Sequence, residues 1–152
     1  MNIETTKPVC EVRSGKDARV EVDAFYESVG SVHRARDEDT FFLLKEGDRV
    51  IGTVRYCVEE GVSLLRSMNV HPDYRGKKFG GILLDAFEGF VEKNGDQIVF
   101  GIPYAHLMSF YGQIGFHEIN ESEAPLFLQE RIKQYRDQYK DKSYSMMRRL
   151  RR

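Results

Sequence analysis

The chain has 152 residues, the usual length of one domain and enough to bury a core of its own. Hydrophobic residues make up 41% of it and charged residues 31%, which is typical of a globular protein and excludes a disordered or fibrous one. The 23 basic and 24 acidic side chains give a net charge of −1, which argues against a dedicated nucleic-acid-binding protein.

The first half of the sequence predicts a strand, a helix and then three strands. We expect strands at Val9–Arg13, Phe41–Lys45, Val50–Val58 and Ser63–Val70, and a helix at Lys16–Val29. The apolar residues at helical spacing in that helix are Val20, Ala24, Phe25 and Val29. Short glycine-bearing turns after Lys45 and Val58 predict that the last three strands form an antiparallel meander.

The second half alternates helices and strands. We expect helices at Gly80–Asn94, Tyr104–Ile114 and Phe127–Lys140, and strands at Ile98–Ile102, Phe116–Ile119 and Ser143–Leu150. The strands on either side of the first of these helices should be parallel, because a strand–helix–strand crossover is right-handed. The sequence therefore predicts a single mixed α/β (α+β) domain over residues 1–152.

Cysteine usage and hydropathy indicate an ordinary intracellular protein. Cys10 and Cys57 lie in apolar segments without CxxC or Cys/His spacing, so neither a metal site nor a disulfide is expected. No apolar run approaches the length of a membrane span and the start is polar, so we expect no membrane partner and a cytoplasmic location. Four arginines near the end are expected to form a solvated run of charge: Arg148, Arg149, Arg151 and Arg152.

The loop Val70–Gly81 carries the strongest functional signal. It connects a predicted strand to a predicted helix, and its sequence is basic and rich in glycine. The first turn of a helix has unpaired backbone N–H groups and the positive end of the helix dipole, so such a loop binds phosphate. Arg75, Lys77 and Lys78 add cationic donors for the same anion.

Two motifs resemble the GNAT superfamily of acyl-CoA-dependent N-acetyltransferases (GCN5-related N-acetyltransferases). The loop Val70-His71-Pro72-Asp73-Tyr74-Arg75-Gly76-Lys77-Lys78-Phe79-Gly80 is similar to the family signature Arg/Gln-x-x-Gly-x-Gly/Ala with its preceding Val-x-Pro-x-Tyr. The segment Phe110-Tyr111-Gly112-Gln113-Ile114-Gly115-Phe116 is similar to the family's Phe-Tyr-x-x-x-Gly-Phe. The spacing of 36 positions between Arg75 and Tyr111 also fits this family.

The resemblance implies a GNAT fold and a set of site residues. The fold has a mixed central sheet of about seven strands, with an antiparallel first half and a parallel pair at the cofactor split, flanked by helices. It implies acetyl-CoA as co-substrate without a metal, and Tyr111 as the acid that protonates the departing thiolate. The implied cofactor-binding residues are Met68, Asn69, Val70, Arg75, Gly76, Lys77, Lys78, Phe79, Gly80 and Gly81.

The sequence departs from the family pattern at two positions. Lys78 stands where the family usually has glycine. If the position needs a positive φ or a close backbone approach to pyrophosphate, lysine would weaken binding. If instead Gly76 supplies the flexibility, the Lys78 ammonium adds a phosphate contact; helix-region geometry tolerates lysine, so we expect binding to be retained. Tyr104 stands where many members carry an asparagine. The contact that this asparagine makes has no counterpart in the sequence.

The sequence does not identify the acceptor substrate. Arg66 and Ser67 are candidate substrate residues, because an arginine within a central strand either forms a structural ion pair, for example with Glu59 or Glu21, or holds a carboxylate of the acceptor. The leading hypothesis is acetylation of a small-molecule primary amine, amino-acid-like or polyamine-like. The alternatives are a non-catalytic acyl-CoA sensor and an acetyltransferase of protein N-termini or aminoacyl-tRNA. No general base is identified, and family analogy adds a homodimer as an option.

Overall fold

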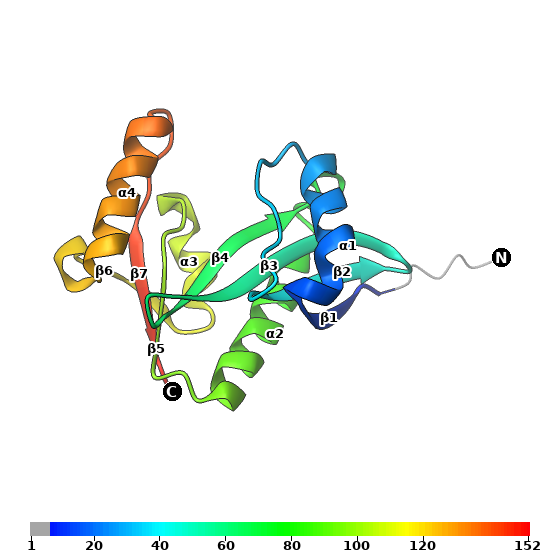
Figure 1. Ribbon diagram of the computed structural model, residues 1–152, viewed down its shortest axis with the longest axis horizontal. Helices are drawn as coiled ribbons and strands as arrows, with labels where there is room; N and C mark the ends of the chain where they lie inside the picture. Colours follow the sequence, from blue (N-terminus) through cyan, green and yellow to red (C-terminus); the bar gives the residue numbers. More distant parts are fainter. Residues whose placement is uncertain (1–6) are drawn as a thin grey trace. The chain divides into compact units, whose positions relative to one another are not determined.

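A computed structural model describes residues 7–152, which divide into two compact units. The first unit runs to Val58 and includes Leu65–Phe90; the second holds Glu59–Leu64 and Val91–Arg152. Whether they form the single predicted domain stays a prediction. In chain order (Figure 1) the elements are β1 (Val9–Ser14), α1 (Gly15–Ser28), β2 (Thr40–Glu46), β3 (Arg49–Glu59), β4 (Val62–Val70), the 3₁₀ turn η1 (Pro72–Tyr74), α2 (Phe79–Asn94), β5 (Ile98–Gly101), η2 (Ala105–Leu107), α3 (Met108–Gly112), β6 (Phe116–Ile119), η3 (Glu121–Glu123), α4 (Leu126–Gln138) and β7 (Met146–Leu150).

The strands form a seven-stranded sheet in the order β1-β2-β3-β4-β5-β7-β6. β1 and β3 are both antiparallel to β2, whereas β4 pairs with β5 in parallel through Ser63–Val99 and Leu64–Phe100. β7 lies between β5 and β6 and is antiparallel to each. This confirms the predicted mixed sheet with an antiparallel first half and a parallel pair.

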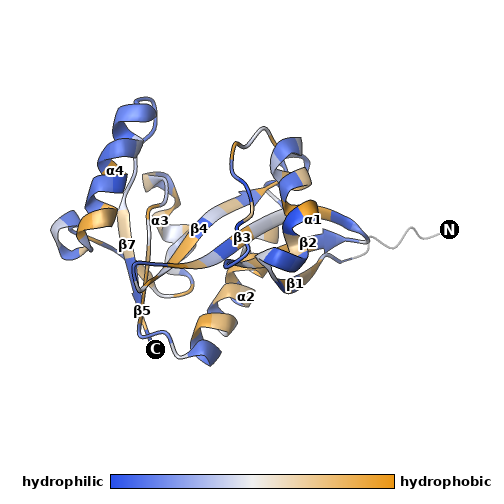
Figure 2. Cartoon of the chain, viewed as in Figure 1, coloured by the Kyte–Doolittle hydropathy of each residue, from blue (hydrophilic) through white to orange (hydrophobic). Residues whose placement is uncertain are grey.

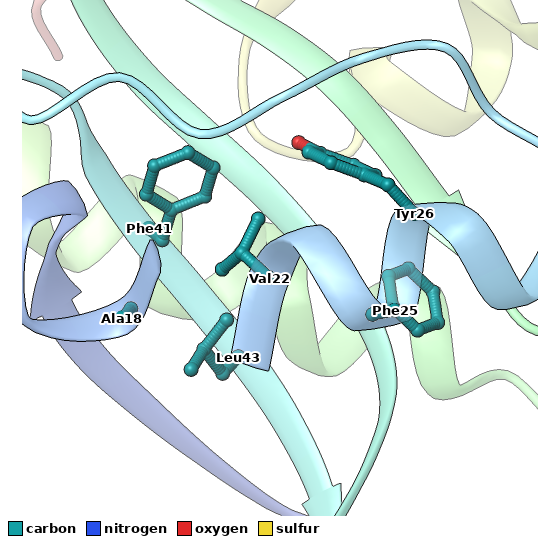
Figure 3. Packing of buried hydrophobic residues seen from close by; sticks show 6 residues of the cluster. All are labelled: Ala18, Val22, Phe25, Tyr26, Phe41 and Leu43. Atoms are coloured by element: carbon teal, nitrogen blue, oxygen red, sulfur yellow. The ribbon is translucent and has the colours of Figure 1, made fainter. Parts of the chain in front are cut away.

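In the first unit, side chains of β2 alternate between two helices, as the two-residue period of a strand requires. Phe41 and Leu43 pack in one cluster with buried residues of α1 (Figure 3). Phe42, between them, contacts the ring of Phe87 on α2 at 5.5 Å between ring centroids. Phe42 and Phe87 are both fully buried. Burial of each such side chain stabilises the fold by roughly 1.5–3 kcal/mol.

The buried face of α1 differs from the predicted one. Of the apolar residues noted at helical spacing, Val20 is 82% exposed and Ala24 is also exposed. The helix instead buries Ala18, Val22, Phe25 and Tyr26. Both sets have helical spacing, and only packing against β2 distinguishes them. The segment after α1 has no further helix before β2.

The turn between β3 and β4 is a two-residue hairpin loop. Glu60 and Gly61 have φ angles of 50° and 76°, and two central residues with positive φ are the mark of a type I′ turn. This turn matches the right-handed twist of the strands that it connects. Left-handed backbone at Glu60 is therefore explained by the hairpin.

In the second unit, the helical elements are shorter than predicted. The helix expected at Tyr104–Ile114 is a 3₁₀ turn, η2, followed by the one-turn α3. The strand expected from Ser143 begins at Met146, and Tyr144 makes only an isolated bridge to Tyr104. Figure 2 shows α4 as mainly hydrophilic, with hydrophobic residues near its start, and it buries Leu128 and Ile132.

The arginine-rich end is not the solvated run that we expected. Arg149 lies within β7 and is 1% exposed. Its Nε donates to the carbonyl of Ile114 at 2.6 Å, and its guanidinium is paired with Glu92. The charge run is thus partly a structural ion pair that connects β7 to α2 and to the chain after α3.

Candidate active site

The predicted phosphate loop leaves β4 along a fixed path. The N–H of His71 donates to the carbonyl of Ile51 on β3 at 2.8 Å, which fixes the loop's first residue against the sheet. His71 Nδ1 then accepts from the N–H of Asp73 at 3.1 Å, at the start of η1. The loop is therefore braced at its entry before its basic part begins.

Cations gather around Tyr74 in this loop. Its hydroxyl donates to Glu46 at 3.0 Å. The Arg49 guanidinium and the Lys77 ammonium lie 5.7 and 5.6 Å from the centroid of its ring, within the range of cation–π attraction. Arg75 Nε donates back to the carbonyl of Val70 at 2.9 Å. These contacts hold three cations in or beside the loop that leads to α2.

The backbone of the loop is left-handed at two residues. Gly76 has a φ of 78° and Lys78 a φ of 64°. α2 begins one residue later, at Phe79, so the helix-region geometry expected for Lys78 is wrong: this lysine occupies a backbone conformation that favours glycine. Arg75, Gly76, Lys77 and Lys78 are all exposed.

The start of α2 suits an anion. No acidic residue lies in its first turn, so the positive end of the helix dipole is not neutralised by the helix itself. An added Cβ at Gly76 or Gly81 would meet nothing within 4 Å. Backbone N–H groups, open space and three nearby cations are what binding of a pyrophosphate requires.

The strand that leads into the loop is interrupted at Ser67. Its φ of 55° breaks the regular pleat of β4, as a β-bulge does. Met68, Asn69 and Val70 follow and are half-buried. The resemblance assigns the pantetheine arm to these three residues, so the irregularity lies immediately before them.

A buried arginine that the sequence analysis missed lies beside Ser67. Arg55 on β3 is 3% exposed; its Nε and Nη2 donate to Ser67 Oγ at 3.1 and 3.0 Å. Its Nη1 donates to Asp39 Oδ2 at 3.1 Å. The signal was available, because Arg55 interrupts an otherwise apolar strand in the same way as Arg66 does.

Arg66 lies next to Ser67 on β4 and is half-buried. Two carboxylates were considered as its structural partners; Glu59 contacts Arg131 at 2.7 Å and Glu21 contacts Lys45 at 2.8 Å. The charge of Arg66 also reaches His33, whose pKa is lowered by burial first and then by Arg55 and Arg66. The guanidiniums of Arg55 and Arg66 thus both lower the pKa of His33.

Tyr111 lies in the second unit, on α3. It is 4% exposed, with its ring in edge contact with Phe110 and Phe116. Burial raises the pKa of the Tyr111 phenol well above its usual value, so the hydroxyl is protonated at neutral pH. Tyr104, at the position of the family's asparagine, is 40% exposed and stacks on His106.

The sequence profile of the GNAT acetyltransferase domain matches residues 37–118, more than half of the chain. The chain belongs to the GNAT acetyltransferase family. Its domain is therefore that of an N-acetyltransferase, a transferase that uses acyl-CoA. No curated protein sequence matches the chain.

Solved structures show the same fold. N-acetylglutamate synthase of Neisseria gonorrhoeae, complexed with coenzyme A and N-acetyl-glutamate, is 19% identical with a TM-score of 0.61; the match covers 95% of this chain but only 36% of that one. The ribosomal-protein-S18-alanine N-acetyltransferase of Escherichia coli is 14% identical with a TM-score of 0.65, covering 93% and 94%. A GNAT-family acetyltransferase of Staphylococcus aureus Mu50 is 16% identical with a TM-score of 0.61, covering 95% and 100%.

Residues 7–152 contain neither a candidate membrane-spanning helix nor a candidate metal site. No helix in that part of the chain is long and apolar enough to cross a membrane. Within the same residues, no group of three or more His, Cys, Asp or Glu side chains is arranged to hold a metal ion. Cys10 and Cys57 are not disulfide-bonded.

Proposed function

We propose that this protein transfers an acetyl group directly from acetyl-CoA to a primary amine of a small molecule. The observation that carries the proposal is the start of α2, where Gly76, Lys77 and Lys78 form an exposed basic turn whose backbone is left-handed at Gly76 and Lys78. The residues fit the pyrophosphate of coenzyme A, which accepts hydrogen bonds from backbone N–H groups and pairs with cations.

The β4 segment Met68–Val70 would hold the pantetheine arm. An extended ligand can hydrogen-bond to an irregular strand as an added strand would. The left-handed turn at Ser67 changes the direction of the neighbouring amides, and one of them could face the thioester carbonyl. A donor aimed at a developing oxyanion stabilises the transition state by roughly 3–4 kcal/mol in other enzymes.

Tyr111 is the proposed acid of the reaction. The amine nitrogen attacks the thioester carbonyl, the C–S bond breaks, and the phenol gives its proton to the departing sulfur. Burial keeps the phenol protonated by raising its pKa, and the same desolvation also raises the pKa of a thiolate leaving group. The ammonium of the acceptor gives one proton to water before the attack, because no base is assigned, and the second proton that the nitrogen loses after the attack restores the phenol.

The acceptor class is the finer part of the proposal. One structural neighbour acts on an amino acid, as shown by its bound N-acetyl-glutamate, and another acts on a ribosomal protein. At identities below 20% these neighbours support the fold alone. A near-neutral net charge of −1 favours a small acceptor over a nucleic acid.

The test is release of CoA thiol from acetyl-CoA with a panel of amines, amino acids, polyamines and peptides, with mass spectrometry of the products. We expect one product heavier by an acetyl group and a rate about 10²-fold lower in Tyr111→Phe. Tyr139→Phe is the matched control, because this tyrosine is partly exposed at the end of α4.

Other results would select an alternative. Binding of acetyl-CoA without thiol release across the panel would identify an acyl-CoA sensor. Acetylation of peptides but of no small amine would identify a macromolecular acceptor. An unchanged rate in Tyr111→Phe would remove this residue from the mechanism while leaving the transferase activity in place.

A further inference from the structure

Three tyrosines and a lysine come together in the second unit, beside the chain that leaves β5 and the chain that enters β7. We call them the tyrosine cluster: Tyr104, Tyr135, Lys142 and Tyr144. Tyr104 follows β5, Tyr135 lies on α4, and the other two lie in the connection from α4 to β7, at the upper left of Figure 1. All four belong to one compact unit, so the distances within the cluster are those of that unit alone.

Backbone pairing holds Tyr104 against Tyr144. The two residues form an isolated antiparallel bridge, with backbone hydrogen bonds of 2.8 and 3.0 Å on either side of it. In a pair of this kind the two side chains lie close together on one face. Their ring centroids are 5.4 Å apart, and the Tyr135 ring lies 5.3 Å from that of Tyr144. The three rings therefore form one aromatic surface that the backbone fixes in place.

The cluster already holds one alkylammonium group, which is that of Lys142. The Nζ of this lysine lies 5.7 Å from the centroid of the Tyr104 ring, within the range of cation–π attraction. A lysine side chain is a flexible four-carbon chain that ends in a compact ammonium. The molecule itself thus shows which kind of group this aromatic surface accepts.

The aromatic surface is accessible from solvent. Tyr104 is 40% exposed, although His106 stacks on its ring at 5.8 Å between ring centroids. Lys142 is also exposed, so its flexible side chain can give way to another cation. Burial, followed by the electrostatic effect of groups that include the Tyr104 phenol and the Asp141 carboxylate, raises the pKa of Tyr144 to about 12. The groups that oppose a negative charge on this phenol attract a positive one.

The cluster is close to the proposed acid along the chain. Tyr104 precedes Tyr111 by seven residues, and the segment between them is η2 and the start of α3. A 3₁₀ turn rises by about 2.0 Å per residue and an α-helix by about 1.5 Å, so the two Cα atoms are no more than about 14 Å apart. A flexible molecule with two amines can place one at Tyr111, where the thiolate is proposed to leave, and the other at the cluster.

We infer that the acceptor is a diamine or polyamine, whose second ammonium binds to the rings of Tyr104 and Tyr144 in place of Lys142. This inference rests on the proposed function, because it names the acceptor class of the same site. Aromatic faces carry negative charge density that attracts a cation. A carboxylate receives no such attraction and is repelled by Asp141, and a simple monoamine has no second group for the cluster.

The test compares a series of α,ω-diamines with monoamines of the same chain length, so that the second ammonium is the only difference. Two readouts are used: thiol release with acetyl-CoA, and calorimetric binding in the presence of CoA, where no acyl group is transferred. We expect diamines to bind and react about five- to thirtyfold better than the matched monoamines. This preference is a ratio of two amines in one variant, so a change in CoA affinity leaves it unaffected.

Three variants give different expected results. Tyr104→Leu removes the ring and should abolish the preference, whereas Tyr104→Phe keeps the ring and should retain most of it. Because Tyr104 is 40% exposed, neither change creates a cavity in the core. Lys142→Gln removes the competing ammonium and should tighten diamine binding about two- to fivefold. Lys133→Gln is the matched control, since Lys133 is an exposed lysine on α4 outside the cluster, and it should bind diamines as the wild type does.

The inference is overturned if monoamines bind as well as diamines, if the preference survives in Tyr104→Leu, or if Lys142→Gln binds diamines no more tightly than Lys133→Gln does. If diamines bind selectively and Tyr104→Leu abolishes this selectivity while no thiol is ever released, the cation site stands and the proposed transferase function fails. If thiol is released with no preference between diamines and monoamines, the function stands and the cation site fails.

Discussion

Lys78 offers a direct test of the loop's backbone geometry. Alanine is ordinarily more stabilising than glycine, and at this position we expect the opposite order. At a φ of 64°, a residue with a Cβ is strained by about 1–2 kcal/mol relative to glycine. Against this, glycine has a larger conformational entropy in the unfolded state, which lowers the stability of a glycine variant by about 0.4–1 kcal/mol relative to alanine. We therefore expect Lys78→Gly to be more stable than Lys78→Ala by about 0.5–1 kcal/mol, or roughly 1–4 °C in Tm.

The assay is urea and thermal unfolding of the two variants side by side, since both lack the ammonium and differ only at Cβ. At any position with ordinary helical or extended backbone, alanine is the more stable of the two. An alanine variant at least as stable as the glycine variant would refute a left-handed conformation at this position.

The same two variants separate the roles of the ammonium and the backbone in CoA binding. If the Lys78 ammonium contacts phosphate, both variants bind CoA more weakly than the wild type and with a smaller dependence on salt. If the strained backbone instead limits binding, Lys78→Gly binds more tightly than Lys78→Ala. Gly76 remains unchanged in both and keeps its own left-handed turn.

Three further predictions concern stability. Gly89 lies exposed within α2 and an added Cβ would meet nothing within 4 Å, so Gly89→Ala should raise the free energy of unfolding by about 0.8–1.0 kcal/mol; an unchanged or lower urea midpoint would contradict this. Asp39→Asn leaves the buried Arg55 without its counter-charge and should destabilise the protein by about 3–5 kcal/mol, seen as a lower Tm; a loss below 1 kcal/mol would show that the pair is not buried in solution. The hydrogen bond from Arg149 lowers the pKa of Glu92, so its stabilising effect is present above the unfolded-state pKa and is lost as the pH falls through the lowered folded value. The wild type should therefore exceed Glu92→Gln in urea midpoint at pH 7, and the difference should vanish in strong acid; a constant difference at all pH values would disprove the linkage.

The parts of the fold that were predicted correctly depend on local signals. The β3–β4 hairpin follows from Glu60-Gly61, and the start of α2 follows from the glycine-bearing loop before it. The buried face of α1 did not follow from the sequence, because two sets of apolar residues share helical spacing and only the position of β2 selects between them. Periodicity fixes the existence of a helix better than its orientation.

The partners of the buried arginines could not be predicted, because the groups that neutralise a buried charge lie far away in the sequence. Arg55 is paired with Asp39, and Arg149 is paired with Glu92, 57 residues earlier. A run of arginines at the end of a chain is usually solvated, and Arg149 departs from this only because β7 lies between two other strands. Arg66, by contrast, was noticed from its place in an apolar strand.

Backbone strain supplies independent support for the proposed site. Among residues 7–152, three residues other than glycine have left-handed backbone: Glu60, Ser67 and Lys78. The hairpin between β3 and β4 accounts for Glu60, but no turn of this kind accounts for the other two. Ser67 comes immediately before the strand residues assigned to the pantetheine arm, and Lys78 immediately before the helix assigned to the pyrophosphate. Strained residues other than glycine persist mainly where function requires them, and here the two that lack a structural explanation are both at the segment that the family motif assigns to coenzyme A.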